Sequence, residues 1–213
     1  MKYLTFKERI REAPLFWTKD LPLLGEDEQT LRNQIGRWQD RGLLLKLRRG
    51  LYLLNKSDRQ ISPSRLFVAN QLYSPSYVSL EYALGVYGLI PERVLDVTSV
   101  TTRKTQAFHN EVGHFIYRHI KKECFSGFKL VKDEAGLPYF IAEPEKAVVD
   151  FLYFNRTRFG QDAPQVFKEG FRFQNVSTLK RGKVLAFAAF FKNRKLSVMC
   201  KQFCDFVREV KSD

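Results

Sequence analysis

The sequence has few of the residues that cross-link a small protein or bind a structural metal. It contains three cysteines, Cys124, Cys200 and Cys204, with no CxxC motif and no His-paired spacing. An odd number of cysteines in such an arrangement argues against both a disulfide framework and a zinc site. We therefore expect free thiols, a reducing compartment and a fold that depends on its own hydrophobic core.

Long apolar runs are missing as well. The longest, residues 184–191, is much shorter than the roughly 20 residues that a membrane-spanning helix needs. The first residues are polar and charged, unlike a secretory signal. We expect a soluble, cytoplasmic protein that does not bind a membrane.

The sequence also lacks a P-loop, a GxGxxG fingerprint and a Ser/His/Asp order. One group of side chains could still hold Mg²⁺ and polarise water in a nuclease. It consists of Asp96, Glu143, Glu145, Lys146 and Asp150. Residues 143–145 are typical of a helix start, and Asp150 follows Glu145 by five residues, which does not place both on one helix face. We expect a structural role for this group.

The histidines His109, His114 and His119 recur at intervals of five residues. Neither a helix nor a strand places residues with this spacing on one side, so a three-histidine metal site is not expected. We predict that the protein holds no metal, uses no cofactor and is not an enzyme.

Positive charge, in contrast, is abundant. The 36 Lys and Arg residues outnumber the 23 Asp and Glu residues and give a formal net charge of +13. Such a surplus attracts polyanions and speeds encounter with nucleic acid, although anionic membranes attract the same charge. With 44% hydrophobic residues in a chain of 213, two ordinary domains are expected.

The first part of the chain has the pattern of three helices and a hairpin. Apolar spacing over residues 4–13, from Leu4 through Phe6 and Ile10 to Ala13, predicts a short helix ended by Pro14. A second short helix is expected over residues 18–24, with Thr18 as its N-cap and Gly25 after it.

A third helix is expected over residues 27–41, where Leu31, Ile35 and Trp38 share one face and Gly42 provides the stop. Residues 43–47 and 51–54 then alternate as two strands around a tight turn. Three helices followed by a hairpin predict a winged helix-turn-helix DNA-binding domain in residues 1–57.

The rest of the chain predicts a second domain, residues 62–213, after a polar linker at 55–63. Its expected strands are residues 94–102, 114–120, 128–131 and 139–142. Its expected helices are residues 79–87 with Ser79 as the cap, 144–155 with Pro144 in the first position, 178–191 and 195–210. The fold class is therefore α+β: a winged helix followed by a mixed α/β domain with a small sheet and C-terminal helices.

The third helix and the hairpin carry the residues that could read DNA. In a helix-turn-helix the third helix lies in the major groove, where Arg pairs with guanine and Asn or Gln with adenine. The candidate residues on and just after this helix are Thr30, Arg32, Asn33, Gln34, Arg37 and Arg41. The candidates on the hairpin are Lys46, Arg48 and Arg49, which suit phosphate contacts or a reach into the minor groove.

A second basic set surrounds the predicted sheet. It consists of Arg103, Lys104, Arg118, Lys121 and Lys122. Such a set is usually a solvated face, and its functional alternatives are an extension of the DNA footprint or a contact with an acidic partner.

The sequence also resembles a known family, the AbiEi-type antitoxins of bacterial type IV toxin–antitoxin systems. In the first domain the similar residues are Leu31, Trp38, Arg41-Gly42 and Leu47-x-Arg49-Gly50-x-Tyr52. In the second domain they are Ser79-Leu80-Glu81-x-Ala83-Leu84, Tyr87-Gly88-Leu89-Ile90-Pro91, Val97-Thr98-Ser99-Val100-Thr101, Phe115-x-Tyr117, Phe125-x-Gly127 and Ile141-Ala142-x-Pro144-Glu145-Lys146-Ala147-x-x-Asp150. The order and spacing of these pieces carry the resemblance over most of positions 30–155.

The resemblance implies a repressor that binds repeats in its own promoter, with a second domain that neutralises a nucleotidyltransferase-like toxin. A stand-alone transcriptional regulator without a toxin is the nearest alternative. Two others stay open: an adaptor whose winged helix docks protein instead of DNA, and a metal-dependent nuclease that uses the carboxylates around Glu143.

Overall fold

The computed structural model describes residues 1–20, 27–157 and 165–212. The protein is a mixed α+β fold with one sheet of three strands and one of six, which confirms the α+β part of the predicted fold class, while the winged helix stays a prediction. Of the second helix predicted over residues 18–24, residues 18–20 form a short 3-10 turn and the remainder lies outside the described residues. In the part of the chain that is described, no helix is both long and apolar enough to span a bilayer.

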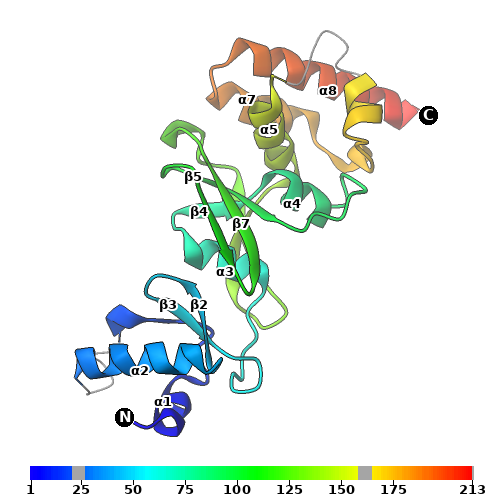
Figure 1. Ribbon diagram of the computed structural model, residues 1–213. Helices are drawn as coiled ribbons and strands as arrows, with labels where there is room; N and C mark the ends of the chain where they lie inside the picture. The colour runs from blue at the N-terminus through cyan, green and yellow to red at the C-terminus, as the bar shows by residue number, and fades with distance from the viewer. Residues whose placement is uncertain (21–26, 158–164, 213) are drawn as a thin grey trace.

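The N-terminal unit combines two helices with a three-stranded antiparallel sheet (Figure 1). Its elements are α1 (Tyr3–Ile10), β1 (Phe16–Trp17), α2 (Glu28–Asp40), β2 (Leu44–Arg48) and β3 (Leu51–Leu54). The strand order is β1-β3-β2, so the short strand before α2 joins the hairpin that follows it.

Helix α1 differs from its prediction in one respect. Phe6 and Ile10 are buried, but Leu4 is 70% exposed and the helix ends before Ala13. Leu4 precedes Phe6 by two positions, so the two side chains point to opposite sides of the helix. Phe6 packs on Trp38 of α2, with ring centroids 4.8 Å apart, and thus joins the two helices.

The C-terminal unit is built around a six-stranded sheet in the order β6-β7-β5-β4-β9-β8. Its strands are β4 (Ser76–Val78), β5 (Val97–Thr101), β6 (Gln106–Asn110), β7 (Gly113–His119), β8 (Phe128–Lys132) and β9 (Pro138–Ala142). The pairs β4–β9 and β5–β7 are parallel and the others antiparallel. The sheet is larger than the predicted small sheet, because the pattern of residues indicated neither β4 nor β6.

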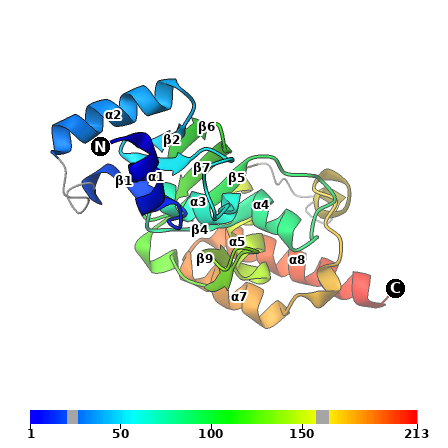
Figure 2. The same cartoon turned by 90° about the horizontal axis from the view of Figure 1, so that it is seen from below.

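Helices cover this sheet and extend beyond it (Figures 1 and 2). They are α3 (Arg65–Leu72), α4 (Leu80–Val86), α5 (Pro144–Asn155), α7 (Arg181–Phe190) and α8 (Arg194–Ser212). The 3-10 helix η2 (Lys122–Cys124) lies between β7 and β8, and the π-helix η3 (Val166–Gly170) and the 3-10 helix η4 (Val176–Thr178) lie between α5 and α7. The expected positions of α4, α5, α7 and α8 are confirmed within a few residues, whereas α3 was not predicted.

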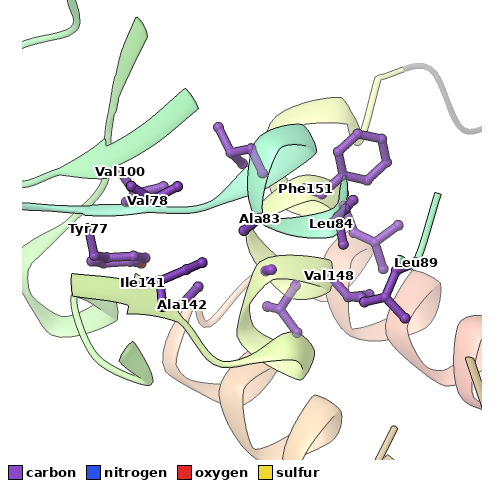
Figure 3. Close-up of a cluster of buried hydrophobic side chains, with 14 of the residues drawn as sticks. Tyr77, Val78, Ala83, Leu84, Leu89, Val100, Ile141, Ala142, Val148 and Phe151 are labelled. Carbon is purple, nitrogen blue, oxygen red and sulfur yellow. The ribbon is translucent and has the colours of Figure 1, made fainter. Parts of the chain in front are cut away.

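The core of the C-terminal unit lies where β4, β5 and β9 meet α4 and α5. Figure 3 shows Val78 and Val100 over Tyr77 and Ile141, with Leu84 and Val148 filling the space between the two helices. These six side chains are at most 2% exposed. Burial on this scale, at roughly 25 cal/mol per Å² of apolar surface, holds sheet and helices together.

The β2–β3 hairpin lies between the two units. Leu44 and Leu54 pack into the small cluster under α2, whereas Leu47, Leu51 and Leu53 pack into the large C-terminal core. Figures 1 and 2 show the hairpin between α2 and the β6–β7 region. Both faces of the hairpin therefore contribute buried leucines, and the predicted division into domains 1–57 and 62–213 stays a prediction.

Candidate nucleic-acid interface

Helix α2 is fixed at both ends by local hydrogen bonds. The Asp27 carboxylate accepts from the Thr30 N–H at 2.7 Å, and this bond lowers the pKa of Asp27. At the other end, the Leu43 N–H donates to the Trp38 carbonyl and the Gly42 N–H to the Gln39 carbonyl, both at 2.9 Å. Gly42 has φ +68°, the left-handed conformation that this C-terminal motif requires. The start and stop predicted for α2 are confirmed.

The buried face of α2 agrees with its prediction. Leu31, Ile35 and Trp38 are 0%, 2% and 6% exposed and pack into the small cluster. Because these anchors follow the helical period, they fix the rotation of α2 about its axis. The polar face is thereby held pointing away from the protein.

Five of the predicted contact residues form one line along α2, which we call the α2 stripe. Its members are Thr30, Asn33, Gln34, Arg37 and Arg41. They are spaced i, i+3, i+4, i+7 and i+11, and all are exposed except Gln34, which is half-buried. Figures 1 and 2 show α2 at the outer end of the molecule, away from α7 and α8.

Arg32 does not belong to this stripe. It is five positions from Arg37, which corresponds to about 140° around the axis of an α-helix with 3.6 residues per turn. Arg32 is exposed but lies on the opposite flank of α2. The six helix candidates are thus divided five to one.

The three basic hairpin residues are also separated. Lys46 and Arg49 are exposed, whereas Arg48 is half-buried, with its guanidinium 4.7 Å from the centre of the Trp17 ring. Burial lowers the pKa of Arg48, and the nearby charge of Arg103 lowers it further. Arg48 therefore faces the C-terminal unit, while Lys46 and Arg49 remain accessible.

The second basic set is dispersed over the C-terminal unit. Arg103 and Lys104 line a shallow hollow after β5, together with Tyr73 and His119. Arg118 instead stacks on Phe154, with its guanidinium 4.8 Å from the ring centre. Lys121 and Lys122 are exposed at the start of η2.

The carboxylate group around α5 forms a buried network and an exposed ion pair. Lys146 and Asp150, i and i+4 on α5, form an ion pair in which both side chains are 0% exposed. Asp150 also accepts from Tyr77 and Ser79, each at 2.9 Å, and Lys146 donates to the Tyr77 hydroxyl at 2.8 Å. Burial, and then the Asp150 charge, raises the pKa of Tyr77 well above its ordinary value.

This network corrects the expected role of Ser79. The residue precedes α4, but its hydroxyl makes no capping bond and donates to Asp150 instead. The two glutamates of the group are also engaged, Glu143 with Lys183 and Glu145 with the backbone N–H of Lys180. These contacts join β4 and α4 to the helices behind the sheet.

The three histidines do not come together at one place. His109 and His114 face each other across β6 and β7, and His114 pairs with Asp96 at 3.1 Å. His119 is bonded through Nδ1 to the Arg103 carbonyl at 2.8 Å. Within residues 1–20, 27–157 and 165–212, no three His, Cys, Asp or Glu side chains come close enough together to hold a metal ion.

Two features of this region were missed in the sequence. Trp17 forms the platform under Arg48, and Asn110 joins the two units by donating to the Leu47 carbonyl at 3.0 Å. A signal for β1 existed in the short apolar stretch that includes Trp17. No local signal could have identified Asn110, since its partner lies 63 positions away.

No protein-family model matches the chain, and no curated protein shows significant similarity to it. The resemblance to the AbiEi-type antitoxins thus stays a prediction from the motifs. The geometry of α2 and the hairpin has to support any functional conclusion.

Proposed function

We propose that this protein binds double-stranded DNA through the α2 stripe and represses transcription, with α2 as the recognition helix of a winged helix-turn-helix. The described order of helix, strand, helix and hairpin, with β1 added to β3, supports this proposal, because it agrees with a winged helix apart from the second helix, most of whose predicted residues lie outside the described ones. The net charge of +13 supports it as well, since phosphates supply much of the affinity of such complexes.

The observation that carries the proposal is the α2 stripe itself. From Thr30 to Arg41 it extends about 16 Å at 1.5 Å per residue, and the major groove admits a helix of this kind. Asn33 and Gln34 can pair with adenine and Arg37 with guanine, while Arg41 at the helix end suits a phosphate. Three buried anchors behind the stripe keep these side chains in a fixed orientation.

Fewer residues of the hairpin are available for DNA contacts than the sequence predicted. Lys46 and Arg49 are exposed and can contact phosphates beside the groove, but Arg48 is held against Trp17. We therefore assign the phosphate contacts of the hairpin to Lys46 and Arg49.

Arg37 and Arg32 provide a matched test, since both substitutions remove one arginine from an exposed position of α2. In fluorescence anisotropy with a duplex from the upstream region, Arg37→Ala should weaken binding by about 1–3 kcal/mol, roughly 5- to 150-fold. Arg32→Ala should lose less, because it lies on the other flank. Wild-type affinity should also fall steeply as salt rises from about 50 to 200 mM.

Two results would overturn the proposal. If the wild-type protein bound neither the upstream duplex nor a scrambled one at low salt, the adaptor function would be favoured. If Arg32→Ala and Arg37→Ala were equally impaired and sequence preference persisted in both, α2 would not be the reading element.

The second part of the proposal is the antitoxin role that the motif resemblance implies. In this role the C-terminal unit neutralises a nucleotidyltransferase-like toxin encoded next to the protein. Co-expression tests it directly: the full chain, and also the Arg37→Ala variant, should restore growth to cells that express the neighbouring gene. Binding to the upstream duplex without such rescue would indicate a stand-alone regulator.

A further inference from the structure

A loop in the C-terminal unit presents positive charge in a fixed geometry. Residues 102–105 follow β5. Thr101, the last residue of β5, pairs with His119 at the end of the parallel strand β7. The carboxyl ends of two parallel strands therefore meet here, a place where ligands commonly bind. The hollow at this point has a volume of about 660 Å³, and we call it the 102–105 hollow. Its lining residues are Tyr73, Thr102, Arg103, Lys104, Thr105 and His119.

Hydrogen bonds hold this loop from several sides. The Tyr73 hydroxyl donates to the Lys104 carbonyl at 3.1 Å, and Arg103 Nη1 donates to the Ser74 carbonyl at 3.2 Å. His119 contacts the loop twice, since its Nδ1–H donates to the Arg103 carbonyl and its backbone N–H to Thr105 Oγ1. The Arg103 guanidinium also stacks on Tyr73, 4.4 Å from the ring centre. A loop held in this way is preorganised for a ligand.

The hollow contains cations and hydroxyl groups but no carboxylate. Arg103 and Lys104 supply the charge, and Thr102 and Thr105 supply hydroxyls. Thr105 accepts from the His119 N–H, which leaves its own O–H able to donate to a ligand. Among the described residues, neither Arg103 nor Lys104 forms an ion pair with a carboxylate.

Arg48 of the N-terminal unit adds a third positive charge beside the hollow. It lies near enough to Arg103 for the two charges to repel, and near enough to Tyr73 to interact with it. Its Nε is buried and has no acceptor in the described part of the chain. An anion in the 102–105 hollow would offset the repulsion between the charges of Arg48 and Arg103.

We propose that the 102–105 hollow is a phosphate-binding site, in which Arg103 and Lys104 bind a phosphoryl group and the threonine hydroxyls orient it. Planar guanidinium groups bind phosphate oxygens in pairs, and hydroxyl donors complete such sites. The phosphoryl group belongs to a nucleic acid backbone or to a small phosphorylated compound. The site is separate from the α2 stripe, so it does not require the proposed function to be correct.

Calorimetric titration of the full chain at about 50 mM salt distinguishes the two sources. The probes are inorganic pyrophosphate and a duplex of scrambled sequence. The wild-type protein should bind at least one of them, and Arg103→Gln should weaken that binding about tenfold, the equivalent of one charge-assisted contact. Arg93→Gln serves as the matched control, because Arg93 is an exposed arginine of the same unit that does not line the hollow.

Lys104→Gln provides a second variant in case the loss of the Arg103 stacking affects folding, and it should weaken the same probe. If the two substitutions weaken pyrophosphate binding, the ligand is a small phosphorylated compound. If they weaken duplex binding alone, the ligand is a nucleic acid backbone. The inference fails if neither probe binds, or if both hollow variants bind as tightly as Arg93→Gln. If instead the α2 proposal is wrong, the wild-type protein shows no preference for the upstream duplex over the scrambled one, while its binding of pyrophosphate is unaffected.

Discussion

The amide of Asn110 donates to the backbone oxygen of Leu47 at 3.0 Å and so connects the tip of the β6–β7 hairpin to strand β2. The other end of the same amide accepts from the Val112 N–H at 2.9 Å, which fixes the side chain in place. One residue of the C-terminal unit thus contacts the strand that carries Lys46 and Arg48. The positions of the two units depend on contacts of this kind.

Asn110→Asp removes this bond and places a carboxylate oxygen beside the Leu47 carbonyl. An ionised aspartate can still accept from the Val112 N–H, but it repels the Leu47 carbonyl instead of donating to it. We expect a loss of at least about 0.5–1.5 kcal/mol in the free energy of unfolding, measured in urea. Asn110→Ala, which loses both side-chain bonds without adding a charge, should also be less stable than wild type. If Asn110→Asp were as stable as the wild-type protein, the contact between the units would not depend on this hydrogen bond.

Asp150→Ala should be among the most destabilising substitutions in the chain. It leaves the Lys146 ammonium 0% exposed without a counter-charge, and it removes the acceptor of Tyr77 and Ser79. The breaking of a buried pair from one side typically costs about 3–5 kcal/mol. Glu92→Gln is the control, because its ion pair with Arg172 is exposed and should contribute under about 1 kcal/mol. Equal effects of the two substitutions in urea unfolding would contradict the buried network.

Asp58 should make part of the stability dependent on pH. The Lys7 ammonium and the Tyr3 hydroxyl donate to its carboxylate at 2.6 Å each, and these bonds lower the pKa of Asp58. Because the folded pKa lies below the unfolded value of about 3.9, the stabilisation is present above that value and disappears as pH falls through the folded pKa. Asp58→Asn should thus be less stable than wild type at pH 7, and the difference should shrink at acidic pH. A difference that stays constant down to pH values below about 3 would refute the ion pair.

The thiols should be inert in the folded protein. Cys124, Cys200 and Cys204 are buried and free, and burial raises the pKa of Cys200 to about 12. Because the thiolate is the reactive form, an aromatic disulfide reagent at pH 8 should react slowly with the native chain and rapidly with three thiols in guanidinium. Fast reaction of one thiol in the native protein would show that the structure around that thiol opens and exposes it to the reagent.

Local chemistry allowed part of this structure to be predicted. Trp38 and its neighbours fixed the face of α2, Gly42 its end, and Pro144 the start of α5, because each of these signals lies within one turn of chain. The i,i+4 spacing of Lys146 and Asp150 is also visible in the sequence and is typical of an ion pair on one helix face.

Other elements had weak local signals. Ser64 caps helix α3 by accepting from the Phe67 N–H at 3.1 Å, but the helix is buried on several sides, from Phe67 to Asn70, so it lacks the polar face that reveals a helical period. Strand β6 at the sheet edge is mostly exposed and polar, and its pairing with β7 defines it. The division of the basic residues into the α2 stripe, the Trp17 stack and the 102–105 hollow depends on contacts between distant segments.

The leucines on both faces of the β2–β3 hairpin have a practical consequence for any attempt to transfer the N-terminal unit, with its proposed DNA-binding helix, to another protein. Cleavage of the chain after residue 57 would uncover Leu47, Leu51 and Leu53, which are at most 3% exposed in the intact protein. Such a bare leucine ribbon promotes self-association. The N-terminal unit therefore cannot be transferred by itself, and a chimera has to include the β6–β7 hairpin as well or replace those leucines with polar residues.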